Sequence, residues 1–241
     1  MNKRKEGGKL VISETYYLRL AAAAVLGSIT VPEALREIPL DAMTDGELEQ
    51  LFQLGKEREL KLYRFKKTHE DLPRVRVVLG ILSGICPESL LDVGSGRGVF
   101  LFPFMEAFPW VPVTSLDILP HRVAFLQTLT AGGIENLRAR EGDICREPLP
   151  ENAYDVVTLL EVLEHIPDAQ GAVRNALRAA KRHVIVSVPS KPDNNPEHIH
   201  LLTKEKLTQL FREAGCHSLH FSGVPGHLIL VATKEGVTNE A

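Results

Sequence analysis

The sequence predicts an α/β fold built around a doubly wound, mostly parallel sheet with helices on both faces. From Pro87 onward, short apolar runs alternate with segments of helical length, a pattern that is typical of consecutive strand–helix–strand units. The apolar runs are SLLDVG, VTSLDI, YDVVTLL, HVIVSVP and HLILVATK. A glycine-rich loop follows the first run directly, which makes it the first candidate for a ligand site.

Residues that start and stop helices stand between these runs. Pro120 suits the first turn of a helix after SLDI, and Gly132-Gly133 suits its end. A second helix is expected to begin near Asp168, and a last one runs from a cap at Thr203 to Gly215. These helix-start and helix-stop residues therefore agree with the alternation of strands and helices.

The region before the first run differs in character. Residues 1–75 are charged and contain no strand-like run, and Thr44 and Glu47 have the spacing of a capping box at a helix start. We therefore expect a helical extension or cap over 1–75, an α/β domain over 76–236 and a flexible tail over 237–241.

The composition limits the class of protein. With 241 residues, of which 44% are hydrophobic, the chain can bury a core of its own. The net charge of −3 gives no overall attraction to nucleic acid or membrane, and no apolar run reaches the ~18 residues of a membrane span. Glu14 and Arg19 interrupt the one stretch that is similar to a signal peptide. Cys86, Cys145 and Cys216 lie too far apart to suggest a disulfide framework or a zinc site, which favours a reducing cytoplasm.

The glycine loop has an unusual spacing for a nucleotide-binding fold. Gly94, Gly96 and Gly98 follow the pattern G-x-G-x-G, whereas dinucleotide folds use G-x-G-x-x-G to rest a pyrophosphate on a helix N-terminus. Val99 stands where the third glycine of that motif would be, and Asp92 precedes the loop. A carboxylate there would repel a phosphate but attract a cation. The loop therefore favours a cationic ligand.

The stretch DVGSGRG, residues 92–98, resembles the first motif of class I S-adenosylmethionine-dependent methyltransferases. The cofactor of that family carries a sulfonium and an ammonium but no phosphate. Glycines let such a cofactor lie against the main chain, because a Cβ atom there would collide with it. The resemblance covers about residues 85–235 and implies a Rossmann-like fold with seven strands, the seventh antiparallel. A nicotinamide-dependent Rossmann enzyme is the alternative.

Two further carboxylates match motifs of the same family. Asp117, which ends VTSLDI 23 positions after Gly94, matches the acid that accepts the ribose hydroxyls; its alternative role is a helix cap before Pro120. Asp143, in EGDI, matches a residue near the adenine amino group. The resemblance thus implies that S-adenosylmethionine is bound by Asp92, Gly94, Ser95, Gly96, Gly98, Asp117, Ile118, Asp143, Ile144 and Glu161.

The segment EVLEH follows the fourth expected strand. If it is helical, Glu161, Glu164 and His165 lie on one face, beside the glycine loop. His198 and His200 follow later, two residues apart, and both could face the cleft in extended chain. Two carboxylates and imidazoles at one place could hold a divalent cation.

Two families share a similar E-x-x-E-H cluster. The small-RNA 3′-terminal ribose 2′-O-methyltransferases have a later His five residues before a Thr, which is the spacing of His198 and Thr203. Ubiquinone-biosynthesis O-methyltransferases carry the cluster in connection with a divalent metal. The resemblance therefore implies Mg²⁺ or Mn²⁺ held by Glu161, Glu164, His165 and His198, with the metal lowering the pKa of an acceptor hydroxyl. In the alternative without metal, Glu161 orients the cofactor, and His165 or His198 is the general base.

Other methyltransferase chemistries lack their residues in this chain. Adenine and glutamine N-methyltransferases resemble one another in an Asp/Asn-Pro-Pro-aromatic motif after the fourth strand, where this chain has LLEVLEH. Cytosine C5-methyltransferases need a nucleophilic Cys on the catalytic side of the cleft. Cys86 and Cys145 are not expected there, so oxygen methylation is favoured.

A basic segment precedes the fold. Between Gly55 and Arg76, eight Lys or Arg stand against four Asp or Glu, with aromatic residues interleaved. Such a segment could grip phosphates and stack bases of single-stranded RNA, or it could be an amphipathic helix that covers the domain. Because extensions of this kind often form a lid over the acceptor in the family, the candidates for substrate contact are Arg64, Lys66, Lys67 and His69.

The sequence therefore predicts a methyltransferase that uses S-adenosylmethionine to methylate a hydroxyl oxygen. Its catalytic residues would be Glu161, Glu164, His165 and His198. The acceptor would be a small molecule or RNA, and neither DNA nor membrane is expected as a partner. The alternatives are a ribose 2′-O-methyltransferase acting at an RNA 3′ end and an inactive module that binds S-adenosylmethionine or RNA. The sequence predicts neither the acceptor nor the oligomeric state.

Overall fold

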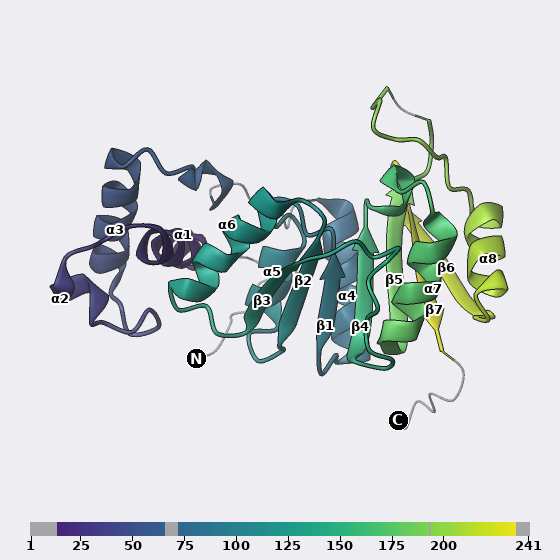
Figure 1. Cartoon of the computed structure of the whole chain (residues 1–241), viewed down its shortest axis with the longest axis horizontal. Coiled ribbons are helices and arrows are strands. Elements are labelled where there is room, and N and C mark those ends of the chain that lie inside the picture. The colour runs from purple at the N-terminus through teal and green to yellow at the C-terminus, as the bar shows by residue number, and fades with distance from the viewer. Residues whose placement is uncertain (1–13, 66–71, 193, 235–241) are drawn as a thin grey trace.

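A continuous seven-stranded sheet runs through the molecule (Figure 1). The structure is a computed structural model that describes residues 14–65, 72–192 and 194–234. The strands are β1 (Leu90–Val93), β2 (Val113–Asp117), β3 (Leu137–Glu141), β4 (Tyr154–Leu160), β5 (Ala180–Pro189), β6 (Ser218–Val224) and β7 (His227–Thr233). The helices are α1 (Glu14–Ser28), α2 (Glu33–Arg36), α3 (Asp45–Glu57), α4 (Pro73–Ile85), α5 (Leu101–Ala107), α6 (Pro120–Ala131), α7 (Ala169–Ala179) and α8 (Lys204–Glu213), with 3-10 turns η1 (Leu62–Phe65) and η3 (Leu163–His165).

The sheet has the order β3-β2-β1-β4-β5-β7-β6. Strands β1 to β5 pair in parallel, and β7 is antiparallel to both β5 and β6. The predicted Rossmann-like sheet with an antiparallel seventh strand is therefore confirmed. The chain leaves β1 towards β2 on one side and returns to β4 on the other, and a crevice forms at such a switch point, beyond the carboxyl ends of the strands.

Helices cover both faces of this sheet. Alternate residues of a strand point to opposite faces, so Leu90 packs into one hydrophobic cluster and Leu91 into another. The first cluster joins the sheet to α4, α5 and α6, and the second joins it to α7 and α8. The helices begin at the expected residues. Helix α6 starts at Pro120, Asp168 caps α7, and Thr203 caps α8.

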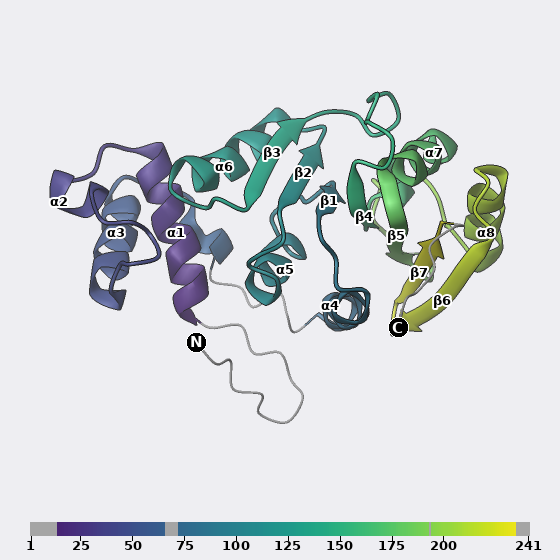
Figure 2. The same ribbon diagram turned by 90° about the horizontal axis from the view of Figure 1, so that it is seen from below.

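The helices before the sheet are part of the first core. Figure 2 shows α1 beside α6, with α3 on its far side. A Cβ atom on Gly132 would lie 1.8 Å from the Ala23 carbonyl oxygen, and one on Gly27 would lie 2.0 Å from that of Thr128. The two helices therefore approach backbone to backbone. The capping box of Thr44 is present at the start of α3.

The basic segment does not form the single amphipathic helix that was one of its two interpretations. It is split among the end of α3, η1 and the start of α4, so it is not one amphipathic helix. Phe65 is 2% exposed and stacks on Phe125 with ring centroids 5.5 Å apart, so it belongs to the core and cannot stack on a base. Lys66, Lys67 and His69 lie outside the described residues, as does the side chain of Arg64.

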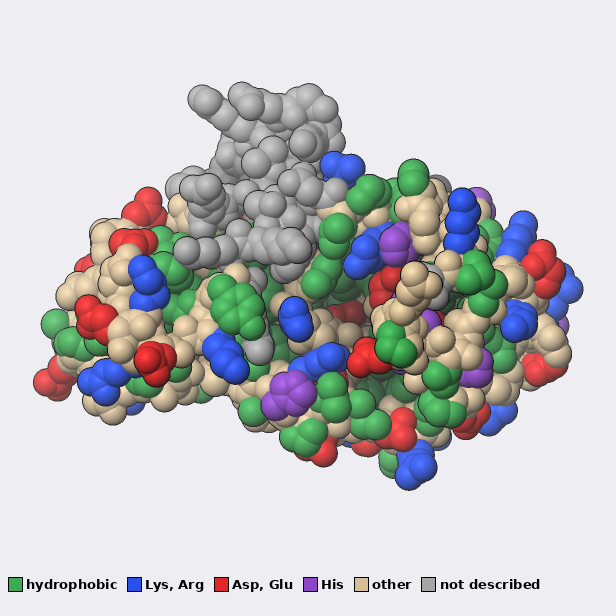
Figure 3. Space-filling view, turned by 90° about the horizontal axis from the view of Figure 1, so that it is seen from above, with side chains coloured by type: hydrophobic (Ala, Val, Ile, Leu, Met, Phe, Trp, Pro, Cys, Tyr) green, Lys and Arg blue, Asp and Glu red, His purple; other side chains and the backbone are tan. Residues whose placement is uncertain are grey.

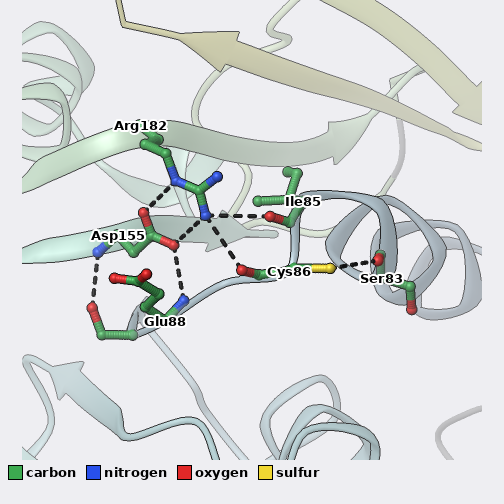
Figure 4. Close-up of polar contacts among 7 residues, drawn as sticks. Ser83, Ile85, Cys86, Glu88, Asp155 and Arg182 are labelled. Carbon is green, nitrogen blue, oxygen red and sulfur yellow. Dashed lines mark hydrogen bonds and ion pairs between the residues drawn. The ribbon is translucent and has the colours of Figure 1, made fainter. Parts of the chain in front are cut away.

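An ion pair joins strands β4 and β5 near their amino ends (Figure 4). Arg182 of β5 donates from Nε and Nη2 to the carboxylate of Asp155 on β4, each at 2.5 Å. Its Nη2 also reaches the carbonyl oxygens of Ile85 and Cys86 at the end of α4. The crevice lies at the opposite end of these strands, beyond their carboxyl ends. Across the described ranges, no helix has the length and apolar character needed to cross a membrane.

Candidate functional site

A cavity of about 760 Å³ opens at the carboxyl edge of the sheet, beside β1 and β4. Figure 3, which looks down on this edge, shows a hollow with acidic side chains inside it and basic ones nearby. Its volume lies within the range of small-molecule sites. Of the residues expected to bind the cofactor, the cavity is lined by Asp92, Gly94, Ser95, Gly96, Asp117, Ile118, Asp143, Ile144 and Glu161.

The glycine loop leaves β1 in a left-handed conformation. Gly94 and Gly96 have φ values of 67° and 59°, which other residues adopt rarely. A Cβ atom on Gly96 would make ordinary contacts within the protein, 3.7 Å to the Gly94 carbonyl oxygen and 3.8 Å to Nη1 of Arg122. Gly98 is different, because a Cβ there would lie 2.3 Å from the ring of Phe102. Gly98 therefore serves the packing of the loop on α5 and does not line the cavity, contrary to the expectation from the motif.

Asp92 places a buried carboxylate at the base of the loop. Its Oδ1 accepts a hydrogen bond of 2.7 Å from Thr158, and it is 2% exposed. Its Oδ2 is buried and finds no hydrogen-bond partner among the described residues. Burial raises the pKa of Asp92 to about 6. An orphaned acceptor of this kind suits a ligand that brings hydrogen-bond donors or positive charge, and both are present in S-adenosylmethionine.

Asp117 lies at the end of β2, next to the loop. Its Oδ2 accepts from the Gly96 amide at 3.3 Å, and its Oδ1 accepts from the Leu119 amide at 3.0 Å. Arg122 approaches Oδ2 to 3.6 Å. The carboxylate is thus held by the backbone on both sides at the cavity wall. Since each carboxylate oxygen can accept about two hydrogen bonds, capacity remains for ligand hydroxyls.

Asp143 and Ile144 follow β3 on the same wall. The Oδ1 atom of Asp143 accepts from the Cys145 amide at 2.9 Å, and Arg146 lies 3.5 Å from Oδ2. Cys145 lines the cavity as well, although the sequence did not single it out for the site. Burial, with Asp143 nearby, raises the pKa of its thiol to about 11. Because the thiolate is the nucleophile, Cys145 is unsuited to covalent catalysis.

Glu161 leaves β4 with a left-handed φ of 58°. Its Oε1 accepts from the Ser187 hydroxyl at 2.7 Å, and its Oε2 lies 3.2 Å from Nε2 of His227. The condition that EVLEH be helical is not met, because only residues 163–165 form a 3-10 turn. Glu161 is consequently not on one face with Glu164 and His165, and it is not part of the group that could share a metal ion.

The structure does bring together Glu164, His165 and His198. One potential ligand atom from each lies within 4.8 Å of the others, and the two imidazole rings meet edge to face at 4.8 Å. The loop before α8 is fastened here, since the amide of Ile199 donates to the Glu164 carbonyl at 2.9 Å. His200 instead turns its Nε2 to the carbonyl of Ile166 at 3.1 Å, so it is not in the group.

The tautomer of His165 follows from its partner. Its Nδ1 lies 2.9 Å from the carbonyl oxygen of Glu197. Because a carbonyl can only accept, Nδ1 carries the proton, and Nε2 of the neutral ring keeps a lone pair. His165 also lines the cavity. Its Nε2 can therefore accept a proton or bind a cation.

Some residues at the site were missed by the motifs. Arg74 from α4 and Arg97 from the glycine loop line the cavity, and no ion pair links either to the described part of the chain. Arg74 precedes the loop motif by 18 positions and comes from a helix whose path the sequence does not reveal. Ser187 and His227 come from later strands and meet Glu161 only through the sheet.

Comparison with known proteins supports the assignment of the fold. The model of a family described as "Methyltransferase domain" matches residues 63–220. A ubiquinone biosynthesis O-methyltransferase of Pseudomonas savastanoi is 36% identical over 119 residues, which are 48% of this chain and 50% of that protein. One of Nitrosomonas europaea is 32% identical over 138 residues, 56% of this chain and 57% of that protein. The chain thus spans about half the length of the curated relatives that it matches.

Solved structures agree on the fold. An O-methyltransferase family protein of Burkholderia thailandensis aligns with a TM-score of 0.56 at 17% identity, over 79% of this chain and 60% of that one. Magnesium protoporphyrin IX methyltransferase of Synechocystis, solved with bound S-adenosylhomocysteine, aligns with a TM-score of 0.53 at 17% identity, over 67% of this chain and 82% of that one. The family match covers more than half of the chain, which therefore belongs to the methyltransferase domain family and has the fold of class I S-adenosylmethionine-dependent methyltransferases.

Proposed function

We propose that this protein transfers a methyl group from S-adenosylmethionine to a hydroxyl oxygen of a small molecule. The arrangement that carries the proposal is the contact between the donor cavity and the group of Glu164, His165 and His198. His165 belongs to both, so an acceptor bound at this group would face the donor. The resemblance to proteins named ubiquinone biosynthesis O-methyltransferases supports oxygen as the acceptor atom.

The cavity residues fit the methyl donor. The Gly94–Gly96 backbone would let the donor lie against the main chain, and Asp117 would accept its ribose hydroxyls. The orphaned Oδ2 of Asp92 would accept from its donors. Arg74 supplies a cation that complements the methionyl carboxylate, while Ile118 and Ile144 supply apolar surface. These residues would hold and orient the donor.

The potential metal ligands Glu164, His165 and His198 fit a divalent transition ion better than Mg²⁺. They are two imidazoles and one carboxylate, and imidazole favours softer ions than an all-oxygen site does. A divalent ion bound there would polarise the acceptor hydroxyl and lower its pKa. In the absence of the ion, Nε2 of His165 is placed to take the hydroxyl proton.

Direct metal binding tests this part of the proposal. Mn²⁺ titrated calorimetrically into the wild-type protein should bind at one site, and His198→Ala should weaken that binding about 10- to 100-fold because a ligand is lost. His217→Ala, at an exposed histidine of another loop, is the matched control and should bind like the wild type. Methyl transfer from radiolabelled S-adenosylmethionine to a catechol should fall when the ion is chelated. Transfer that persists undiminished under chelation would exclude the metal and leave a histidine as the general base.

The alternative of an RNA 3′-end methyltransferase shares the cluster of Glu164, His165 and His198, whereas RNA binding was expected from the basic segment between Gly55 and Arg76. The segment that suggested RNA binding includes 66–71, which lie outside the described residues, and its Phe65 is buried in the core. No contact of the described residues favours an RNA acceptor over a small molecule. The same labelling assay, with a single-stranded RNA in place of the catechol, tests that alternative.

A further inference from the structure

Glu161 has an unusual backbone conformation for a residue with a side chain. Its φ of 58° lies in the left-handed region, where residues other than Gly, Asn and Asp are uncommon and strained. The strand ladder nevertheless continues to this residue, since its amide donates to the Ser187 carbonyl at 2.9 Å. The chain therefore turns sharply at Glu161, and something must hold the side chain in the direction that results.

Two side chains from neighbouring strands hold it. Ser187 of β5 donates its hydroxyl to Oε1 at 2.7 Å, and His227 of β7 has Nε2 at 3.2 Å from Oε2. Ser187 is fully buried and lines the cavity. His227 is 26% exposed on its side chain and does not line the cavity. Each oxygen of the carboxylate thus has its own partner, Ser187 within the cavity lining and His227 outside it.

The direction of β7 explains how its first residue reaches this place. Parallel strands bring their carboxyl ends to the active edge, but an antiparallel strand brings its amino end there. His227 begins β7 and pairs with Pro189 at the end of β5. Gly226, with a φ of 88°, makes the turn, and its carbonyl oxygen accepts from the Ser190 amide at 3.0 Å. The reversal of β7 therefore adds one side chain to the site from the far end of the chain.

We propose that His227 and Ser187 are positioning residues, which fix the Glu161 carboxylate so that it faces the sulfonium charge of the methyl donor. This inference rests on the proposed function. The hydrogen bond from Ser187 and the contact with His227 occupy only part of the capacity of a carboxylate, and Glu161 lines the cavity, so capacity remains for a bound ligand. S-adenosylmethionine carries the sulfonium charge, and S-adenosylhomocysteine does not. A carboxylate held in this way therefore favours the first over the second.

Calorimetric binding of both ligands tests this proposal. His227→Ala should raise the Kd of S-adenosylmethionine about tenfold, the effect of one lost polar contact to a charged group, while the Kd of S-adenosylhomocysteine changes less than about twofold. His227→Gln, whose amide can replace the Nε2 donor, should restore the wild-type ratio. Ser187→Ala should shift the ratio in the same direction. His220→Ala, at an exposed histidine of β6, is the matched control and should not shift it.

A double variant separates positioning from general loosening. In a Glu161→Gln background, His227→Ala should cause no further change in the ratio of the two Kd values, because the carboxylate is already absent. The proposal is overturned if His227→Ala leaves the ratio unchanged or weakens both ligands equally in a protein that melts at the wild-type temperature. Should His227→Ala fail to fold, Ser187→Ala decides in the same way. A wild-type protein that binds neither ligand would instead refute the proposed function.

Discussion

Asp92 shows how a single buried carboxylate couples stability to pH. Its pKa is raised by burial from 3.8 to about 6. Burial favours the protonated acid, so the contribution of this group to stability is fully present below pH 3.8 and is lost as the pH rises through about 6. At about 1.4 kcal/mol per pH unit, the loss amounts to about 3 kcal/mol.

Asp92→Asn should remove this dependence. Measured by urea unfolding, the free energy of unfolding of the wild type relative to the variant should fall by about 3 kcal/mol between about pH 4 and about pH 7. The comparison cancels the other titrating groups, which both proteins share. A difference that stays constant with pH would show that the buried acid is not the cause.

Asp117 is the second carboxylate whose role can be measured. Asp117→Ala should weaken the binding of S-adenosylhomocysteine by about 1–3 kcal/mol, because it removes the acceptor of the ribose hydroxyls. Glu141→Ala provides the control, since Glu141 pairs with Asp117 in register at the end of β3 but is exposed and does not line the cavity. Equal affinities of wild type and Asp117→Ala by calorimetry would refute the assignment.

Local patterns predicted the residues of the cavity that stand next to strand ends. Gly94, Asp117 and Asp143 each lie at or just after the carboxyl end of a strand, so their meeting at one end of the sheet follows from the parallel arrangement. His227 and Arg74 come from distant segments, and their approach depends on the path of the chain through a turn and a helix. The sequence alone does not contain that path in any local signal.

At the scale of elements, α1 and α6 are joined by unusually close contact. Gly132→Ala would put a Cβ atom 1.8 Å from the Ala23 carbonyl oxygen, so one of the helices must move. We expect a loss of about 1–3 kcal/mol in the free energy of unfolding, as for other overpacked positions. Gly80→Ala in α4, where nothing lies within 4 Å, should instead stabilise the protein by about 0.5–1 kcal/mol. Equal effects of the two substitutions in thermal unfolding would contradict this packing.

The elements that were predicted well are the buried ones. Strands β1, β4, β5 and β7 run through the core and therefore appear as apolar runs. The edge strand β6 is half exposed and lacks such a run, so it was implied only by the resemblance. The EVLEH segment has helical spacing, yet Glu161 has a left-handed φ of 58° and its side chain contacts Ser187 and His227 of neighbouring strands. The spacing carries no signal of these tertiary contacts.

Across the whole molecule, the amino and carboxyl ends of the parallel strands have separate roles. The Asp155–Arg182 pair (Figure 4) joins β4 and β5 near their amino ends, and neither residue lines the cavity at the carboxyl ends of the strands. Burial of Asp155 acts to raise its pKa, but the hydrogen bonds from Arg182 outweigh it, and the pKa is lowered. The pair therefore stabilises the fold above pH 3.8 and loses its effect as the pH falls through the lowered pKa.

Arg182→Gln should cost about 3 kcal/mol of unfolding free energy at neutral pH, because it leaves a buried carboxylate unpaired. The cost should shrink as the pH falls below 3.8 and through the lowered pKa of Asp155. Arg138→Gln, at an exposed arginine of β3, is the control and should be nearly neutral. The affinity for S-adenosylhomocysteine should not change in either variant, and a large change would contradict the separation of the two ends.

The measurement that tests the central assignment most directly is a calorimetric titration of the wild-type protein with S-adenosylhomocysteine and, separately, with a pyridine dinucleotide. The cavity lined by Asp92, the glycine loop and Asp117 should bind one equivalent of the first and show no heat with the second. Heat from the dinucleotide alone would contradict the account, because a phosphate would then bind beside carboxylates that should repel it and attract a cation.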